Sequence, residues 1–155
     1  MIIYIGADHR GFDLKESLKK YLNEAGYEVA DFGATKKDET DDYVDYAIKV
    51  ASEISKGSSI GRGILLCKSG VGMDVVANKF RNVRCSLCFS PDQAILARND
   101  DDANILVLPS GFLDEVRAKQ IVSVWLNTKF DHKENHSRRI KKIEELEQKI
   151  TNYFE

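Results

Sequence analysis

Residues 67–72, with the sequence CKSGVG, join a nucleophilic side chain to a glycine-rich turn. The apolar run that precedes them, residues 63–67, predicts a buried strand, and the residues that follow predict a helix. Amide groups at the start of a helix favour anions, so they can lower the pKa of a thiol and hold an oxyanion. Two interpretations stay open: Cys67 is a small core residue, or it is a reactive thiol beside a ligand-binding loop.

A second pair of chemical groups, Asp8 and His9, follows the apolar run of residues 2–6. An aspartate after a strand often accepts backbone hydrogen bonds and caps the following turn. The same pair could instead carry a proton and contact a phosphate group. The two interpretations have equal support from the residues alone.

Other polar groups have simpler explanations. Cys85 and Cys88 are three residues apart, so in a strand they point to opposite faces and cannot share one metal ion. His132 and His136 have helical spacing but lack the companion residues of a zinc motif, which indicates chance. The acidic run at residues 99–102 is either a solvated loop or the source of a carboxylate for a site.

Strands and helices alternate along the whole chain. Short apolar runs predict strands at residues 2–6, 27–32, 63–67, 83–89 and 104–108. Helical periodicity falls between them and continues to about residue 153, and Pro91 suits the first turn of one helix. This alternation predicts an α/β fold: a three-layer α/β/α sandwich with a Rossmann-like five-stranded parallel sheet. No linker or repeat divides residues 1–155, which predicts a single domain.

Ligands of open parallel sheets bind beyond the carboxyl ends of the strands. The first strand ends before Asp8, and the third ends at Cys67. We therefore expect these residues and the glycine turn to meet at one edge of the sheet.

Composition excludes several classes of partner. The chain has 23 basic and 25 acidic residues, so its charge is nearly balanced, and no basic surface indicates nucleic acid. No apolar segment is long enough to predict a membrane span or a signal peptide. Three cysteines without a secretory signal predict a reduced, cytoplasmic setting.

The ordered motifs resemble one family, the type B ribose-5-phosphate isomerases, which are related to the isomerases of allose 6-phosphate and galactose 6-phosphate. The resemblance covers nearly the whole chain and rests on GADHRGFDLK, DDYVDYA, ILLCKSGVGM, ANKF, VRCSLCFSPDQAILAR, ANILVLPS and HSRRIKKI. It implies interconversion of an aldose and a ketose phosphate through an enediolate, most simply ribose 5-phosphate and ribulose 5-phosphate. It implies no cofactor and no metal, and a homodimer or tetramer with active sites at the subunit interface.

The same resemblance implies a role for each matching residue. The proton-transfer residues would be Cys67 as the base, Ser69 as a carrier between sugar oxygens, and Asp100 in the place of a ring-opening histidine. The residues that bind the phosphosugar would be Asp8, His9, Tyr43, Lys68, Gly70, Val71, Gly72, Asn104 and Arg139.

The chain departs from the family pattern at three positions. Asp100 replaces the usual histidine, and a carboxylic acid is a poor proton donor at neutral pH unless burial changes it. Gly111 and Asn135 replace two arginines that would hold the phosphate. Lys68 or Arg10 could restore the missing positive charge. These departures leave two alternatives open: an isomerase of a different sugar phosphate, or a relative that binds a sugar phosphate without catalysis.

Overall fold

The computed structural model describes residues 1–57 and 61–154, with side chains through residue 150. Five strands form one parallel sheet in the order β2-β1-β3-β5-β4. Their bounds are β1 Ile2–Ala7, β2 Glu28–Asp31, β3 Gly61–Cys67, β4 Cys85–Leu87 and β5 Ile105–Pro109. The central strands β3 and β5 are almost fully buried, as expected where helices cover both faces of a parallel sheet.

Six helices connect and follow the strands. Their bounds are α1 Phe12–Glu24, α2 Tyr43–Ser55, α3 Val71–Ala77, α4 Pro91–Asn99, α5 Glu115–Asn127 and α6 Glu134–Phe154. Side chains of Asp42, Ser90 and Asp114 accept backbone N–H bonds at the starts of α2, α4 and α5, which satisfies donors that the helices leave unpaired.

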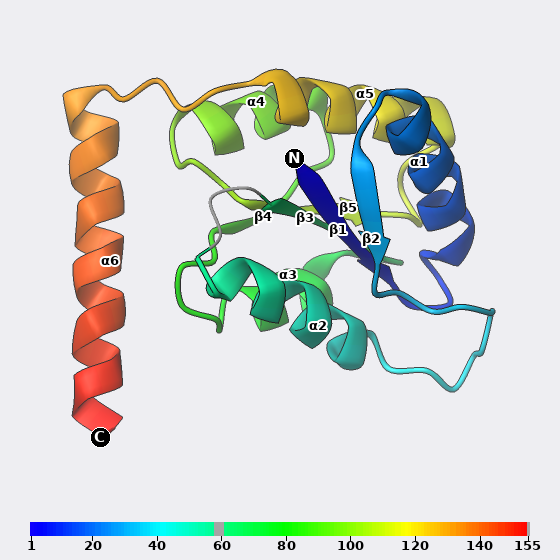
Figure 1. Cartoon of the computed structure of the whole chain (residues 1–155), viewed down its shortest axis with the longest axis horizontal. Helices are drawn as coiled ribbons and strands as arrows, with labels where there is room; N and C mark the ends of the chain where they lie inside the picture. Colours follow the sequence, from blue (N-terminus) through cyan, green and yellow to red (C-terminus); the bar gives the residue numbers. More distant parts are fainter. Residues whose placement is uncertain (58–60, 155) are drawn as a thin grey trace.

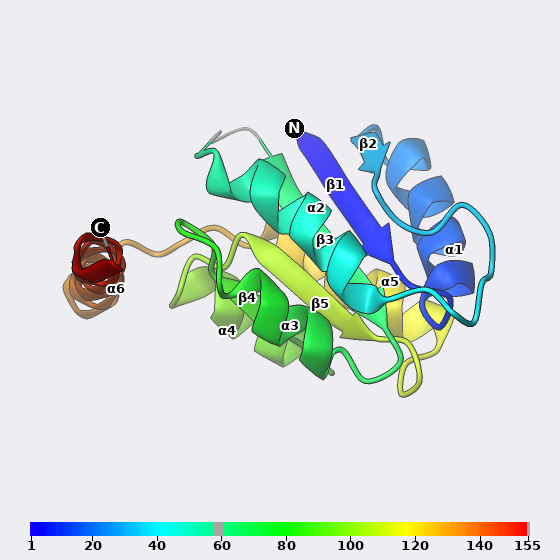
Figure 2. The same cartoon turned by 90° about the horizontal axis from the view of Figure 1, so that it is seen from below.

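The sheet separates two apolar cores. Helices α1, α4 and α5 pack on one face, where Trp125 is the largest fully buried side chain, and α2 and α3 pack on the other (Figure 1; Figure 2). This arrangement confirms the predicted three-layer α/β/α fold with five parallel strands. Cys88 belongs to the first core and Cys85 packs against the second, so the two thiols lie on opposite faces, as predicted.

Helix α6 lies beside the layered body, beyond an extended segment, in both views (Figure 1; Figure 2). Its apolar stripe, Ile143, Leu146 and Ile150, remains exposed. Among residues 1–57 and 61–154, no helix combines the length and apolar character needed to cross a membrane.

The ends of β1, β2, β3 and β5 lie within two residues of the predicted ends. Helix α3 begins at Val71, directly after the turn, because Gly70 adopts a left-handed backbone with φ of 78° and turns the chain at once. Strand β4 is shorter than predicted. The side chain of Asn78 bonds both the N–H and the carbonyl of Cys85, so part of this edge is paired with a side chain instead of a strand.

Candidate active site

The cavity at the carboxyl edge of the sheet collects most of the predicted site residues. It has a volume of about 520 Å³ and lies where β1 and β3 end and α2 and α3 begin. The register pairs Ala7 with Leu66, so the residues that follow these two strands emerge side by side. The lining residues are Asp8, Tyr43, Cys67, Lys68, Ser69, Val71, Gly72 and Val75.

Cys67 lies at the base of this cavity with 5 % of its surface exposed. Its Sγ faces the turn and accepts a hydrogen bond from the N–H of Gly70 at 3.2 Å. Burial raises the pKa of the Cys67 thiol, and the charge of Asp8 adds to this, although the N–H groups of Gly70, Met73 and Ser69 act in the opposite direction. The amide groups of the turn act in the expected direction and favour the ionised sulfur, but desolvation outweighs them, so the pKa of the thiol is raised overall.

Asp8 caps the turn, as one interpretation predicted, and it also lines the cavity, where the other interpretation would place a proton carrier. Its carboxylate accepts the N–H groups of Arg10 and Gly11, each at 3.0 Å. Burial raises the pKa of Asp8, and these two N–H groups oppose the change. The position of Gly11 requires glycine, because a Cβ there would lie 2.6 Å from the carbonyl oxygen of Leu66.

His9 faces a neighbouring, smaller cavity together with Arg10. Its Nδ1 lies 2.5 Å from Oδ1 of Asp41, and its Nε2 accepts from Nε of Arg10 at 3.1 Å. Because an arginine can only donate, the proton of a neutral His9 ring belongs on Nδ1 and points to Asp41. This network orients the imidazole beside the Asp8 turn.

Tyr43 and Gly72 determine each other's positions on the cavity wall. A Cβ at residue 72 would lie 2.5 Å from the Tyr43 ring, so the glycine leaves the space that this ring occupies. The ring projects from the first residue of α2 and is partly exposed. The phenol can therefore reach a molecule in the cavity.

Lys68 packs against Gly111, the position where the family pattern has an arginine. The N–H of Gly111 donates to the carbonyl of Lys68 at 2.9 Å, and a Cβ at residue 111 would lie 3.0 Å from Cγ of Lys68. The same Cβ would lie 2.9 Å from the carbonyl oxygen of Lys68, so the backbone and the stem of Lys68 together occupy the space where a side chain at residue 111 would begin. Its side chain is exposed at the cavity, and within the described part of the chain it forms no ion pair.

Three predicted site residues lie away from this cavity. Asp100 follows α4 and Asn104 precedes β5, which places both at the amino edge of the sheet. Asn104 is occupied there, because its side chain accepts from the N–H of Arg84 and donates to the carbonyl of Asn82. Arg139 is exposed on α6 and makes no ion pair with any described residue. A single chain does not bring these three residues to Cys67.

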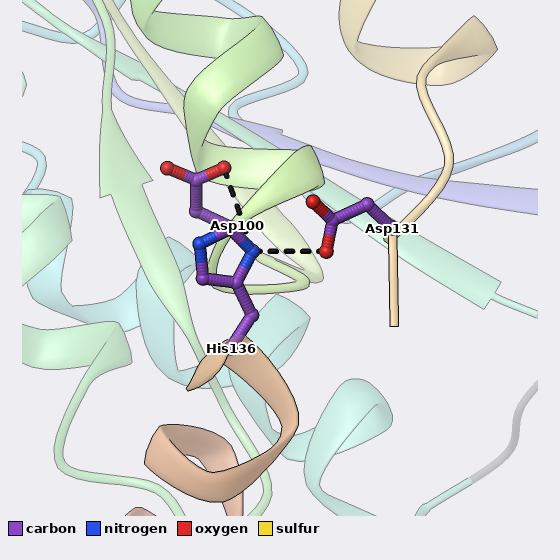
Figure 3. Close-up of side chains that lie close together, drawn as sticks. All are labelled: Asp100, Asp131 and His136. Atoms are coloured by element: carbon purple, nitrogen blue, oxygen red, sulfur yellow. Dashed lines mark hydrogen bonds and ion pairs between the residues drawn. The ribbon is translucent and has the colours of Figure 1, made fainter. Parts of the chain in front are cut away.

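His136 and Asp131 form a site feature that the sequence reasoning missed. His136 is buried, and its Nδ1 lies 2.9 Å from Oδ1 of Asp131 and 3.9 Å from Oδ1 of Asp100 (Figure 3). Although burial acts to raise it, the N–H and ammonium groups of Lys133 together with His136 hold the pKa of Asp131 well below its usual range. The spacing of Asp131 and His136 in the sequence carries no signal, because Asp131 lies in the irregular segment before α6.

The model of the ribose/galactose isomerase family matches residues 3–143. The chain belongs to this family. Ribose-5-phosphate isomerase B of Escherichia coli is 37 % identical over 95 % of this chain and 97 % of its own length. The D-erythrulose-4-phosphate isomerase of Pectobacterium atrosepticum is 36 % identical over 83 % of this chain and 84 % of its own.

A solved member of the ribose/galactose isomerase family has the same fold. The ribose-5-phosphate isomerase B of Mycoplasma genitalium, solved with bound ribulose 5-phosphate, superposes with a TM-score of 0.92 at 38 % identity. The match covers 95 % of this chain and 96 % of that one. These findings confirm the predicted family and the predicted enzyme class, an aldose–ketose isomerase of sugar phosphates.

Proposed function

We propose that this isomerase interconverts ribose 5-phosphate and ribulose 5-phosphate through an enediolate, with Cys67 as the base. The observation that carries the proposal is the single cavity that Cys67, Ser69 and Asp8 all line. A general base needs to lie beside the proton that it removes, and no other cysteine of the described residues lines this cavity.

The proton transfers follow from this arrangement. The Cys67 thiolate takes the proton from C2 of the open-chain aldose, and the electrons of the broken C–H bond form the C1–C2 double bond. The negative charge that develops on O1 faces the amide groups of residues 69–72. Ser69 carries a proton from O2 to O1, and the Cys67 thiol returns its proton to C1. Asp8 and Tyr43 hold the sugar hydroxyl groups.

The experiment follows proton exchange in heavy water. With ribose 5-phosphate, the wild-type protein is expected to form ribulose 5-phosphate and to replace the C2 proton with deuterium, as measured by NMR. Binding of the sugar phosphate without exchange would contradict the proposal and identify a non-catalytic binding protein. Exchange with erythrose 4-phosphate but not with ribose 5-phosphate would support a different substrate, which the relative from Pectobacterium atrosepticum and the missing arginines at Gly111 and Asn135 favour.

We infer that the complete site contains two chains. The cavity rim is apolar and uncovered, because Val71 and Val75 are 55 % and 53 % exposed. The α6 stripe, Ile143, Leu146 and Ile150, is also uncovered. A second copy of the chain would bury both surfaces, because the same patches meet each other across a twofold axis. It would also bring Asp100 and Arg139, which lie outside this cavity, towards the Cys67 of its partner.

Lys68 replaces the missing arginine at residue 111 in this proposal. Its stem occupies the space beside Gly111, and its ammonium group has no carboxylate partner in the described ranges. Loss of a charged hydrogen bond to phosphate costs about 1.5–3 kcal/mol, so Lys68→Ala is expected to raise the inhibition constant of inorganic phosphate by about 10-fold or more. Arg10→Ala tests the second candidate for the missing charge, because Arg10 lines the neighbouring cavity together with His9.

The double variant Lys68→Ala/Gly111→Arg provides a rescue. Removing Cγ of Lys68 relieves one of the two closest contacts of a Cβ at residue 111; the other, 2.9 Å to the carbonyl oxygen of Lys68, requires a small shift of the backbone. We expect the double variant to recover phosphate affinity that the single variant Lys68→Ala loses. Unchanged affinity in both Lys68→Ala and Arg10→Ala would contradict a role for either residue.

A further inference from the structure

In the Asp100–Asp131–His136 cluster, the two carboxylates orient the imidazole ring of His136 as they would orient a general acid. Nδ1 of His136 faces both carboxylates, whereas Nε2 points away from Asp131 (Figure 3). Nε2 has no hydrogen-bond partner among the described residues, and the surrounding side chains do not seal it from solvent. It therefore meets solvent, although the rest of the side chain is buried. A carboxylate at one ring nitrogen holds the imidazole so that the other can exchange a proton.

A metal ion explains this cluster less well. The three side chains offer ligand atoms within 4.8 Å of one another. However, Lys133 places its ammonium group 3.0 Å from Asp131, and Nδ2 of Asn99 donates to both Asp100 and Asp131. Cationic and polar groups of the chain already bind the carboxylates. Nε2 of His136, which has no partner among the described residues, can accept or release a proton.

We propose that His136 and Asp100 together open the sugar ring, with His136 as the acid and Asp100 as the base. The inference rests on the proposed isomerase and on its two-chain site, because the cluster would reach the sugar from the partner subunit. It also explains how a chain with an aspartate at residue 100 keeps a proton donor: an imidazole carries a proton over part of the neutral range, and a carboxylate is ready to accept one.

The ring-opening step balances with these two groups. In the furanose form of ribose 5-phosphate, O4 is bonded to C1. The Asp100 carboxylate takes the proton of the O1 hydroxyl, and the C1–O1 double bond forms. The C1–O4 bond breaks, and its electron pair receives the proton from Nε2 of His136. The pair returns to its first state when the proton of Asp100 passes back to the imidazole through water.

The charged groups around His136 come from three segments. Asp131 and Lys133 lie on the segment before α6, Asp100 follows α4, and Glu134 and Arg138 pair with each other on α6. Asp131 is the positioning residue, because it bonds Nδ1 and does not face the sugar. Lys133 forms an ion pair with Asp131 at 3.0 Å.

The test compares a cyclic with an acyclic substrate. Ribulose 5-phosphate cannot form a five-membered ring, because the oxygen that would close it carries the phosphate. Exchange of its C1 protons in heavy water therefore needs Cys67 but no ring opening. For His136→Gln we expect the rate with ribose 5-phosphate to fall about 10²- to 10⁴-fold, the usual contribution of a general acid. The exchange at C1 of ribulose 5-phosphate is expected to stay within about twofold, since no step of that exchange uses the acid.

The controls separate this inference from the proposed function. His132→Gln changes an exposed histidine outside the cluster and is expected to leave both rates unchanged. If His136→Gln lowers both rates equally, or neither, the histidine is structural or idle and the inference is overturned. If the wild-type protein acts on neither sugar, the proposed function fails, and the ring-opening inference fails with it.

Discussion

Cys67→Ala is expected to remove isomerisation of ribose 5-phosphate almost completely, by about 10³-fold or more. The Cys67 sulfur lines the cavity and accepts a hydrogen bond from the N–H of Gly70, beside the loop that would stabilise the enediolate. Deuterium exchange at C2 is expected to disappear together with turnover, because both need the same proton transfer. Both are measured by NMR in heavy water.

Cys88→Ala is the matched control for this loss. Cys88 is also buried, but it lies in the core on the other face of the sheet. The control variant is expected to keep its activity, and circular dichroism would confirm that both variants fold. Exchange that persists in Cys67→Ala would mean that another group removes the C2 proton.

The pH dependence of the wild-type enzyme follows from the same residue. Because burial raises the pKa of the Cys67 thiol, only a minor fraction is ionised at neutral pH, and kcat/KM is expected to rise as the solution becomes more alkaline. The charge of Asp8 adds to the increase, so Asp8→Asn is expected to shift the midpoint of Cys67 alkylation by iodoacetamide to lower pH. A shift to higher pH would contradict this electrostatic coupling.

Two inactive variants are expected to restore activity when their subunits exchange. Cys67→Ala lacks the base, and Arg139→Ala lacks a cation that the α6 helix presents far from its own cavity. If each site takes Cys67 from one chain and Arg139 from its partner, every mixed dimer contains one intact site. Half of the dimers in an equal mixture are mixed, so about one quarter of the wild-type activity should return.

The control for this complementation is a pair of variants from the same cavity. Cys67→Ala and Asp8→Ala change two residues that line one cavity of one chain. Each site of their mixed dimer keeps one of the two changes, so no activity should return. Recovery with this pair but not with Arg139→Ala would contradict the two-chain site. Sedimentation measurements on the same mixtures would show whether the chain forms dimers.

The order of strands and helices could be predicted because its causes are local. The buried run before Cys67 and the helical spacing after Phe12 depend on neighbours in the sequence. Once the sheet is known to be parallel, the carboxyl ends of its strands share one edge, whatever the details of packing. That rule alone predicted that Asp8 and the Cys67 turn would meet, and the cavity confirms it.

The tertiary structure decided the properties that depend on distant neighbours. The direction of the Cys67 pKa change could not be predicted, because desolvation sums over every group packed around the sulfur, whereas the amide hydrogen bonds come from adjacent residues. Lys68 follows β3 and Gly111 follows β5, and they touch because these two strands are neighbours in the sheet, which is a property of the tertiary structure.

The sequence by itself determined the family, the layered fold and the residues that surround Cys67, since these follow from periodicity and short motifs. Only the tertiary structure joined His136 to Asp100 and Asp131, and only it separated Asn104 and Arg139 from the cavity. The physical reason is the direction of the chain: each crossover helix runs back to the amino edge, so residues that follow a helix lie at the opposite end of the sheet from residues that follow a strand.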